Sequence, residues 1–328
     1  MNISLLTATG LAVLEARLLK SHIPLTVSWA LTHRCNARCL YCGIPQQPMP
    51  EMTTFEIRRL MDELVVLGLR FVSFTGGEPL LRDDIGEIIT HAVSKGLQTS
   101  LSTNGLLVKE KFAQIHKIKR ITLSLDGPEE VHERTRNLGT HRRVLEALSL
   151  TTQAGIKTLL NTVLSKHNLQ SVEYILAVAR KHKVSVFFQP TTVQLLGMHA
   201  PNLEIPPEDE YRQIIANLIR KKKQGEAAIA NSVAGLSHLL RWPQQTNIPC
   251  VAGRLHFRIE PNGDMNICYR KYAVGSEPER NVRAGGAAGA IAGLTPRPCS
   301  GCWCAPFVEL NLATAMNFSA ITNMISQV

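Results

Sequence analysis

The feature that most constrains the fold is a regular alternation of strand-like and helix-like segments from Leu25 to Pro190. The strand-like segments are short and rich in β-branched or apolar residues. The segments between them place apolar residues at three- and four-residue steps behind polar caps, most clearly in the first and the last. Six strands separated by helices predict an α/β protein built from parallel βα units. Ligand groups in such folds lie at the C-terminal ends of the strands.

The bounds of these segments follow from the same patterns. The expected strands are residues 25–31, 71–75, 98–103, 120–125, 157–163 and 184–189. The expected helices between them are residues 53–67, 84–95, 108–115, 140–154 and 169–181.

Directly after the first expected strand, Cys35, Cys39 and Cys42 follow one another with C-x3-C-x2-C spacing. Three thiolates on one loop can ligate three irons of an iron–sulfur cluster and leave the fourth iron open to a small molecule. A zinc knuckle is the alternative, but zinc usually takes four closed ligands. His33 is the nearby candidate for a fourth ligand, although a lone histidine beside a strand end more often makes hydrogen bonds.

With Tyr41 before its last cysteine, this loop resembles the signature loop of the radical S-adenosylmethionine (SAM) enzymes. The resemblance implies a partial (β/α)6 barrel, a [4Fe–4S] cluster on the three cysteines, and SAM bound at the fourth iron. It also implies that the reduced cluster splits SAM into methionine and a 5′-deoxyadenosyl radical. That radical then abstracts hydrogen from a substrate.

Two glycines and a glutamate, Gly76, Gly77 and Glu78, follow the second expected strand. Glycines let the backbone approach a ligand closely, and Glu78 can accept a hydrogen bond from an ammonium group. A plain βα turn is the alternative. Downstream of the cysteine loop, the segment resembles the GGEP motif of radical SAM enzymes, which binds the methionine amino group of SAM.

Small polar residues beside glycine turns follow the next two expected strands. Thr103 and Asn104 end the third, and Ser124 and Asp126 end the fourth. By themselves they are good turn and cap residues. They are similar to family segments whose polar groups approach SAM, so all four are candidate SAM-binding residues, together with Tyr41 and the GGEP residues.

Three further residues, at or after the strand ends, are candidates for the site. Residues 130–136 are similar to the family's loop after the fourth strand. Within them, Arg136 either reaches the SAM carboxylate or pairs with a neighbouring glutamate on a helix, and we favour the pairing. Asn161 and Gln189 end the last two expected strands and are candidates to face the cavity by position alone.

The remaining cysteines gather near the end of the chain, and with the first three they suggest two metal centres. Alternation around residues 261–264 predicts a β-hairpin that brings Cys268 near Cys250, and Cys299 and Cys302 form a C-x2-C pair. Four thiolates make a closed site that suits zinc equally well. The spacing resembles the SPASM/twitch extension of radical SAM enzymes, which implies an auxiliary [4Fe–4S] cluster. Cys304 either replaces one of these ligands or is a free thiol.

Three parts are expected: an N-terminal helical segment over 1–24, the barrel over 25–200, and a smaller cysteine-rich α+β domain over 201–328 that begins with a helical connector. Proline residues near 201–207 mark the second boundary, and residues 208–224 predict a basic amphipathic helix. Residues 284–292, rich in Gly and Ala, predict a flexible loop. Leu5, Leu6, Leu11, Leu14 and Leu18 form a helical stripe that we expect to dock on the body of the protein, with a membrane surface as the alternative.

Charge and composition limit the partners. The formal net charge of +10 favours an anionic substrate or an acidic protein. Nucleic acid is disfavoured because only 5% of residues are aromatic and none cluster with the basic runs. No transmembrane segment and no signal peptide are evident, and unpaired cysteines fit a cytoplasmic protein. We expect an electron donor such as flavodoxin or ferredoxin.

An auxiliary cluster suits a net oxidation, so we expect dehydrogenation or crosslinking of a small molecule. A SPASM-type maturase that modifies a peptide or protein is the main alternative. A non-catalytic iron–sulfur or zinc scaffold and a two-cluster electron-transfer protein also remain, but neither explains the motifs at the strand ends. No catalytic side chain is identified from the sequence.

Overall fold

The computed structural model describes residues 3–137, 139–195, 198, 200–244, 247–268, 280–294 and 301–326. One nine-stranded sheet organises the chain, with strand order β6-β5-β4-β3-β2-β1-β7-β8-β9. Strands β1 to β6 are parallel neighbours in sequence order, as the alternation of segments predicts. All six start and end within one residue of the predicted bounds. They are β1 (Thr26–Thr32), β2 (Phe71–Gly76), β3 (Gln98–Thr103), β4 (Arg120–Ser124), β5 (Lys157–Leu164) and β6 (Ser185–Pro190).

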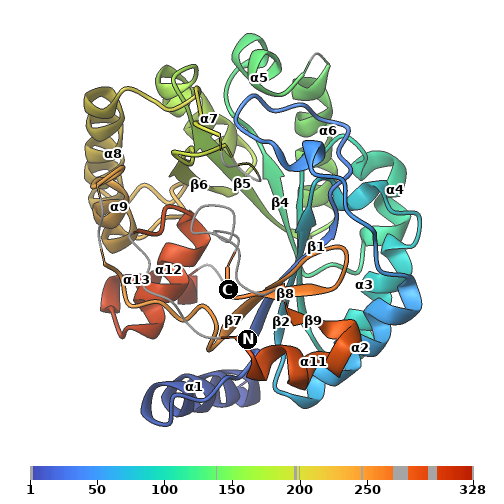
Figure 1. The fold of residues 1–328 in the computed structure, drawn as a ribbon. Coiled ribbons are helices and arrows are strands. Elements are labelled where there is room, and N and C mark those ends of the chain that lie inside the picture. The colour runs from blue at the N-terminus through green and yellow to red at the C-terminus, as the bar shows by residue number, and fades with distance from the viewer. Residues whose placement is uncertain are drawn as a thin grey trace.

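Helices cover the outside of these strands, as Figure 1 shows for α2, α3, α4 and α6. Helix α2 begins where the sequence predicts, because Thr53 and Glu56 form a reciprocal capping box. The helices of this half are α2 (Thr54–Val66), α3 (Ile85–Ser94), α4 (Val108–Ile115), α5 (Glu129–Arg136), α6 (Thr140–Gln153) and α7 (Val172–Lys181). Short 3-10 turns lie at Ile44–Gln46, Pro79–Leu81 and Leu169–Ser171.

Helix α5 corrects the prediction of a loop over residues 130–136. It places Glu129 and Glu130 in its first turn and Arg134 and Arg136 in its last. These charges stabilise the helix because they are opposite in sign to the partial charges of its ends. The pattern is too short and too polar to be recognised as an amphipathic helix.

The second half of the chain continues the same sheet. Strand β7 (His256–Ile259) pairs in parallel with β1, while β8 (Asp264–Asn266) and β9 (Arg280–Asn281) continue antiparallel. The predicted hairpin around residues 261–264 is confirmed by the β7–β8 pairing. The sheet therefore runs across the boundary proposed near residue 200, and the division into domains stays a prediction.

Helix α11 (Val282–Ala292) forms where a flexible loop was expected over residues 284–292. Alanine is the best helix former, and Asn281 caps the helix by accepting from the Arg283 N–H. The helix is interrupted at Gly285 and Gly286, where φ reaches 64° at Gly286. Glu63 of α2 then accepts from the Ala287 N–H at 2.8 Å, which restarts the helix.

Helix α1 (Ile3–Leu18) docks through a different face from the one predicted. The small residues Ala12, Val13 and Ala16 pack against Leu25 and Leu255. Leu11, Leu14 and Leu18 of the leucine stripe face outward instead, and they are 64%, 53% and 71% exposed. The small side chains form the contact because they let the helix approach Leu25 and Leu255, which directly precede β1 and β7, closely.

Four helices lie on the side opposite α2 to α4 in Figure 1: α8 (Glu208–Lys223), α9 (Val233–Leu239), α12 (Ala305–Thr314) and α13 (Phe318–Ser326). Helix α8 ends within one residue of the predicted basic helix. In the described part of the chain, none of the helices is both long and apolar enough to cross a bilayer.

Candidate functional site

The loop after β1 brings together the thiols of Cys35, Cys39 and Cys42. Burial is the largest influence on them, raising the pKa of Cys35 to about 11 and that of Cys42 to about 12, and raising that of Cys39 as well. The thiols are also close enough for a charge on one to raise the pKa of another. Such thiols stay protonated at neutral pH unless a cation stabilises their thiolates, as a metal does. The chemistry of this donor set fits a metal centre.

Nitrogen donors point at two of these sulfur atoms. Nη1 of Arg136 lies 3.6 Å from Sγ of Cys39, and Nδ2 of Asn104 lies 3.8 Å from Sγ of Cys35. The backbone N–H of Ala37 also donates to Cys35, at 3.4 Å. Hydrogen bonds to cysteine sulfurs stabilise thiolates and tune the reduction potential of a bound cluster.

Asp126 is the buried anchor of the cysteine loop. Its Oδ2 accepts from the Tyr41 hydroxyl and from Nε of Arg136, both at 2.6 Å, and its Oδ1 accepts from the Val163 N–H at 3.1 Å. The guanidinium also lies over the Tyr41 ring, 5.5 Å from its centroid. Burial works against the charge on Arg136, but Asp126 holds the pKa of Arg136 well above its ordinary value. Tyr41 and Asp126, both predicted to bind SAM, thus hold the loop in place.

Arg136 pairs with Asp126 across two loops, so its predicted pairing with a neighbouring helix glutamate is wrong. The end of α5 also bonds the cysteine loop through its backbone: the Leu40 N–H donates to Thr135 O at 3.0 Å. No sequence pattern indicates that the end of α5 contacts the cysteine loop, because Arg136 and Cys39 are 97 residues apart.

Gly76 and Gly77 lie against the start of the cysteine loop. A Cβ on Gly76 would come within 2.2 Å of the Thr32 carbonyl oxygen, and one on Gly77 within 2.3 Å of the Arg34 carbonyl oxygen. The Gly77 and Glu78 N–H groups donate to these same two oxygens, at 2.7 and 2.8 Å. The close approach that the sequence predicts at this pair is therefore to the cysteine loop itself.

Glu78 is fully buried and joins two loops. Oε1 accepts from the Leu80 N–H at 3.0 Å and from the Thr103 hydroxyl at 2.8 Å, and Oε2 accepts from the Asn104 N–H at 2.8 Å. Burial raises the pKa of Glu78 to about 7, while these three donors lower it. Both carboxylate oxygens are engaged within the protein, so Glu78 acts as a brace between β2 and β3.

Asn104 reaches the cysteine loop directly, because its Nδ2 donates to Oδ1 of Asn36 at 2.8 Å. Its Oδ1 accepts from the Leu106 N–H at 3.0 Å, which fixes the turn after β3. Ser124 is half-buried as the last residue of β4, where it pairs with Asn161 of β5. Asn104 and Ser124 therefore lie at the C-terminal ends of β3 and β4, on the same edge of the parallel sheet as the cysteine loop after β1.

A buried arginine, which the sequence analysis did not single out, ties β1 to the following segments. Arg82 donates to Asp84 at 2.6 and 2.8 Å, to Glu51 at 3.2 Å and to the Leu31 carbonyl at 3.3 Å. Glu51 in turn accepts from Arg34 at 2.8 Å. An arginine that satisfies several carbonyl and carboxylate oxygens fixes the exit of β1 toward the cysteines.

His33 makes hydrogen bonds, in agreement with the interpretation favoured over a zinc ligand. Nδ1 contacts the Gln47 carbonyl at 2.8 Å and Nε2 contacts Glu260 at 3.2 Å. Glu260 also accepts from Arg258 of β7 at 2.7 Å. The charge of Arg258 in turn lowers the pKa of Cys304, which burial raises to about 12. This buried row of side chains runs from the first cysteine loop toward the second cysteine group.

The second group contains Cys250, Cys268, Cys302 and Cys304. Burial raises the pKa of Cys302 well above its ordinary value, and the nearby charges of the other three raise it further. Cys304 thus takes a place beside the three predicted ligands that are described here. Cys299 lies outside the described residues. Cys250 is exposed and Cys268 is half-buried, so the burial of the Cys302 and Cys304 thiols and the repulsion among the four thiolates are what favour a bound cation.

Helices α9 and α12 and strand β6 surround this second group. The Gln189 side chain accepts from the Ala305 N–H at 2.9 Å, so the end of β6 contacts the residue after Cys304. Nε2 of His238 lies 2.8 Å from the Cys302 carbonyl oxygen, and the His238 ring stacks on Trp303 with centroids 5.3 Å apart. Gln189 therefore faces the second group, more specifically than its strand-end position predicted.

Across the described residues, no three His, Cys, Asp or Glu side chains converge as they would around a single metal ion. Ligands of a [4Fe–4S] cluster bind separate irons, so their sulfurs need not meet at one point.

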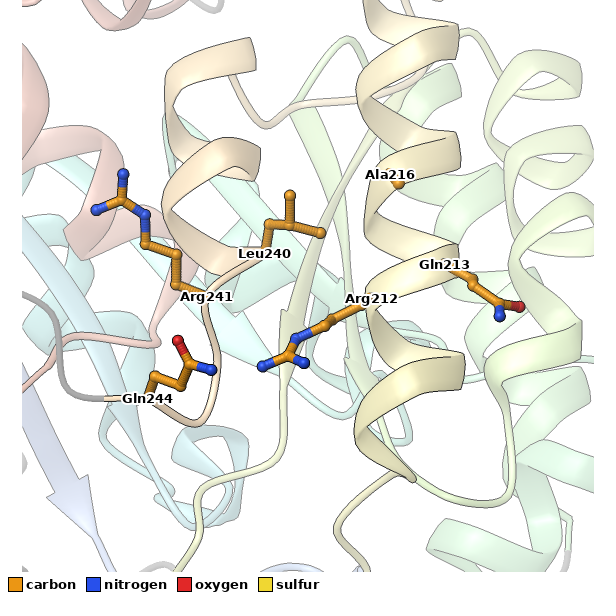
Figure 2. A pocket seen from close by; sticks show the side chains of 6 residues that line it. All are labelled: Arg212, Gln213, Ala216, Leu240, Arg241 and Gln244. Carbon is orange, nitrogen blue, oxygen red and sulfur yellow. The ribbon is translucent and has the colours of Figure 1, made fainter.

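A surface hollow of about 520 Å³ lies away from the strand ends, between α8 and the chain after α9. Figure 2 shows Arg212 reaching from α8 toward Gln244, with Arg241 and Leu240 on the facing chain. Two of the side chains that line this hollow, Arg212 and Arg241, are cationic.

Comparisons with known proteins agree with this geometry. The model of the Radical SAM superfamily matches residues 29–179, which include the first cysteine loop and the ends of β2 to β4. The solved structure of Streptococcus suis SuiB bound to S-adenosylmethionine superposes with a TM-score of 0.69 at 17% identity, covering 86% of this chain and 69% of that one. The α/β fold with a mostly parallel sheet is shared with these enzymes.

Two kinds of relatives resemble the chain in sequence. An AdoMet-dependent heme synthase of Methanosarcina barkeri is 28% identical over 225 residues, which are 65% of this chain and 63% of that protein. A heme synthase of Nitratidesulfovibrio vulgaris is 31% identical, and the match spans 44% of its length. The chain thus spans less than two thirds of both. A PqqA peptide cyclase of Rhodopseudomonas palustris is 26% identical over 306 residues, which are 85% of this chain and 79% of that protein.

Proposed function

Because residues 29–179 form a radical SAM domain, we propose that Cys35, Cys39 and Cys42 hold a [4Fe–4S] cluster with which the chain reductively cleaves SAM. When bound, such a cluster supplies the electron that splits SAM into methionine and a 5′-deoxyadenosyl radical, which takes hydrogen from the substrate. The observation that carries this proposal is a set of three half-buried cysteines on one loop at the C-terminal end of β1, whose thiol pKa values burial raises. Three thiolates leave one iron open for SAM.

The chain's own residues divide into two groups around this site. We propose that the backbone of Gly76, Gly77 and Glu78 and the side chains of Asn104 and Ser124 line the SAM pocket. The side chains of Tyr41, Glu78, Thr103 and Asp126 act on SAM indirectly, since their hydrogen bonds hold the loops that carry the first set. The protein thereby orients SAM and excludes water from the radical.

We further propose that Cys250, Cys268, Cys302 and Cys304 hold an auxiliary [4Fe–4S] cluster. Four thiolates from the chain would saturate its irons, so this cluster is suited to electron transfer rather than to substrate binding. A substrate radical must lose one electron to give an oxidised product. The presence of this second group supports an oxidative reaction such as dehydrogenation or crosslinking.

A small molecule is the first candidate substrate, supported by the similarity to AdoMet-dependent heme synthases. A peptide is the second candidate, supported by the similarity to a PqqA peptide cyclase over 85% of the chain. The fold similarity to SuiB includes a structure bound to its precursor peptide SuiA. Neighbouring genes that encode a short peptide would favour the second candidate.

The test is anaerobic reconstitution, followed by iron and sulfide counts and by measurement of 5′-deoxyadenosine release from SAM under dithionite. We expect about eight irons per chain, four in each cluster, with release abolished in Cys35→Ala. If the unaltered chain binds only about four irons and still releases 5′-deoxyadenosine, the proposal of an auxiliary cluster is wrong. Zinc without release would overturn the radical function.

A further inference from the structure

The hollow between α8 and the chain after α9 forms part of a cationic surface. Helix α8 places Arg212, Ala216, Arg220 and Lys223 on one face, because each follows the one before it by three or four residues. Arg220 and Lys223 are exposed. The opposite face of the helix is buried in the core through Tyr211, Ile215 and Leu218.

Cations outnumber carboxylates on this surface, where Asp209 lies on the same face of α8, three residues before Arg212. Arg241 adds a cation on the facing wall of the hollow. Glu208, one turn before Arg212, pairs with that arginine. Arg220, Lys223 and Arg241 therefore remain to attract a negatively charged partner, and the apolar stems of the arginines with Leu240 provide contact area.

Helix α9, which directly precedes Leu240 and Arg241 of the hollow, also contacts the second cysteine group. His238 of α9 faces inward, 2.8 Å from the Cys302 carbonyl oxygen. Its ring stacks on Trp303. Helix α9 is fixed to α8 by the Tyr211 hydroxyl, which donates to Leu239 O at 3.0 Å. One short helix thus separates the cationic hollow from the thiols.

We propose that this cationic hollow is the docking surface for an acidic one-electron carrier protein of the flavodoxin or ferredoxin class, which exchanges an electron with the second cysteine group's cluster. The inference rests on the proposed function. With a flavodoxin, the cluster that has taken an electron from the substrate radical gives it to the neutral semiquinone, which becomes the anionic hydroquinone. The cluster returns to its oxidised state, and no bond is formed or broken. A second copy of this chain is a poor occupant, because like charges would face each other.

The experiment uses the reconstituted full chain and a bacterial flavodoxin as the probe. One variant combines Arg220→Glu, Lys223→Glu and Arg241→Glu. A matched control combines Lys109→Glu on α4, Lys117→Glu in the turn after α4 and Arg142→Glu on α6, with the same change in net charge. The dissociation constant is measured by calorimetry at low ionic strength. The rate at which flavodoxin hydroquinone reduces the oxidised cluster, which is the reverse transfer in the same docked complex, is measured by anaerobic stopped-flow at several salt concentrations.

We expect the hollow variant to bind flavodoxin at least about tenfold more weakly and with a smaller salt dependence, since three steering charges are reversed. The control variant keeps an affinity within about twofold, because its charges lie elsewhere. All three proteins should cleave SAM alike under dithionite, a small reductant that needs no docking surface. Equal losses in the two variants would overturn the docking surface.

The two proposals fail in different ways. An unaltered chain that cleaves SAM under dithionite but does not bind flavodoxin refutes the docking surface alone. An unaltered chain that holds no iron and cleaves no SAM refutes the proposed function, and the docking proposal falls with it.

Discussion

The two cysteine groups of this protein are built in opposite ways. Cys35, Cys39 and Cys42 lie within eight residues of one another on one loop. Two hydrogen bonds hold this loop: Tyr41 donates to the buried Asp126 carboxylate, and the Glu78 N–H donates to the Arg34 carbonyl oxygen. The second group is collected from residue 250, residue 268 and the pair at 302 and 304. A site on one loop depends on the neighbours that brace the loop, whereas a site collected from three segments depends on the whole C-terminal arrangement.

The largest expected effect comes from removing the anchor of the first group. Asp126→Ala leaves the buried Arg136 guanidinium without its carboxylate partner, and we expect the free energy of unfolding to fall by about 3–5 kcal/mol. Iron at the first group should be lost as well. Chemical denaturation and iron analysis measure both effects.

Asp62→Ala is the matched control, because that carboxylate is 45% exposed where it pairs with Lys95. It should change the free energy of unfolding by less than about 1 kcal/mol. If the two variants are equally stable, Asp126 is not the anchor that its contacts indicate.

The next effect concerns pH and Glu78. Burial raises the pKa of Glu78 from 4.5 to about 7, so the folded chain holds this proton more tightly than the unfolded chain. Stability from this group is present below pH 4.5 and is lost as pH rises through about 7. The loss is about 3 kcal/mol at full effect.

Glu78→Gln removes the titrating group. The difference in unfolding free energy between this variant and the unaltered chain should therefore change across that pH range, as urea denaturation at a series of pH values would measure. A constant difference from pH 4 to 8 would contradict the assignment.

Gly77→Ala tests how tightly the second loop supports the first group. Its added Cβ would lie 2.3 Å from the Arg34 carbonyl oxygen, so we expect destabilisation of about 1–3 kcal/mol and weaker iron binding at the first group. In Gly289→Ala, the new Cβ meets nothing within 4 Å. This control on α11 should raise the melting temperature slightly, since alanine favours helix. Similar losses in both variants would refute the close-approach argument.

The smallest effect on stability is expected at the second group. Cys304→Ala should lower the unfolding free energy of the metal-free chain by about 1 kcal/mol. In the reconstituted chain, it should remove about four of about eight irons. Cys299→Ala should keep all of them if Cys304 is the fourth ligand. If Cys299→Ala loses iron and Cys304→Ala keeps it, Cys299 is the fourth ligand and Cys304 is not.

Local patterns predicted the elements well and the long-range contacts poorly. The six parallel strands were predicted within one residue because each is a short apolar run between turns. Helix α11 was missed because its glycines suggested a loop, although Glu63 of a distant helix restarts it. The leucines of α1 were expected to be buried, but the smaller alanines fit closer to the strand ends.

The sequence by itself determined the parallel barrel strands, the cysteine loop and the position of every motif at a strand end. These features depend on residues that are near each other in the chain, where spacing and side-chain type are sufficient. Only the tertiary structure decided that Arg136 pairs with Asp126, that Glu78 braces β3, and that Cys304 lies beside Cys250, Cys268 and Cys302. Arg136 and Asp126 are ten residues apart, and Glu78 and Cys304 lie beside residues still farther away in sequence. Burial makes their partners obligatory, because an unpaired charge or donor in the core is too costly to leave.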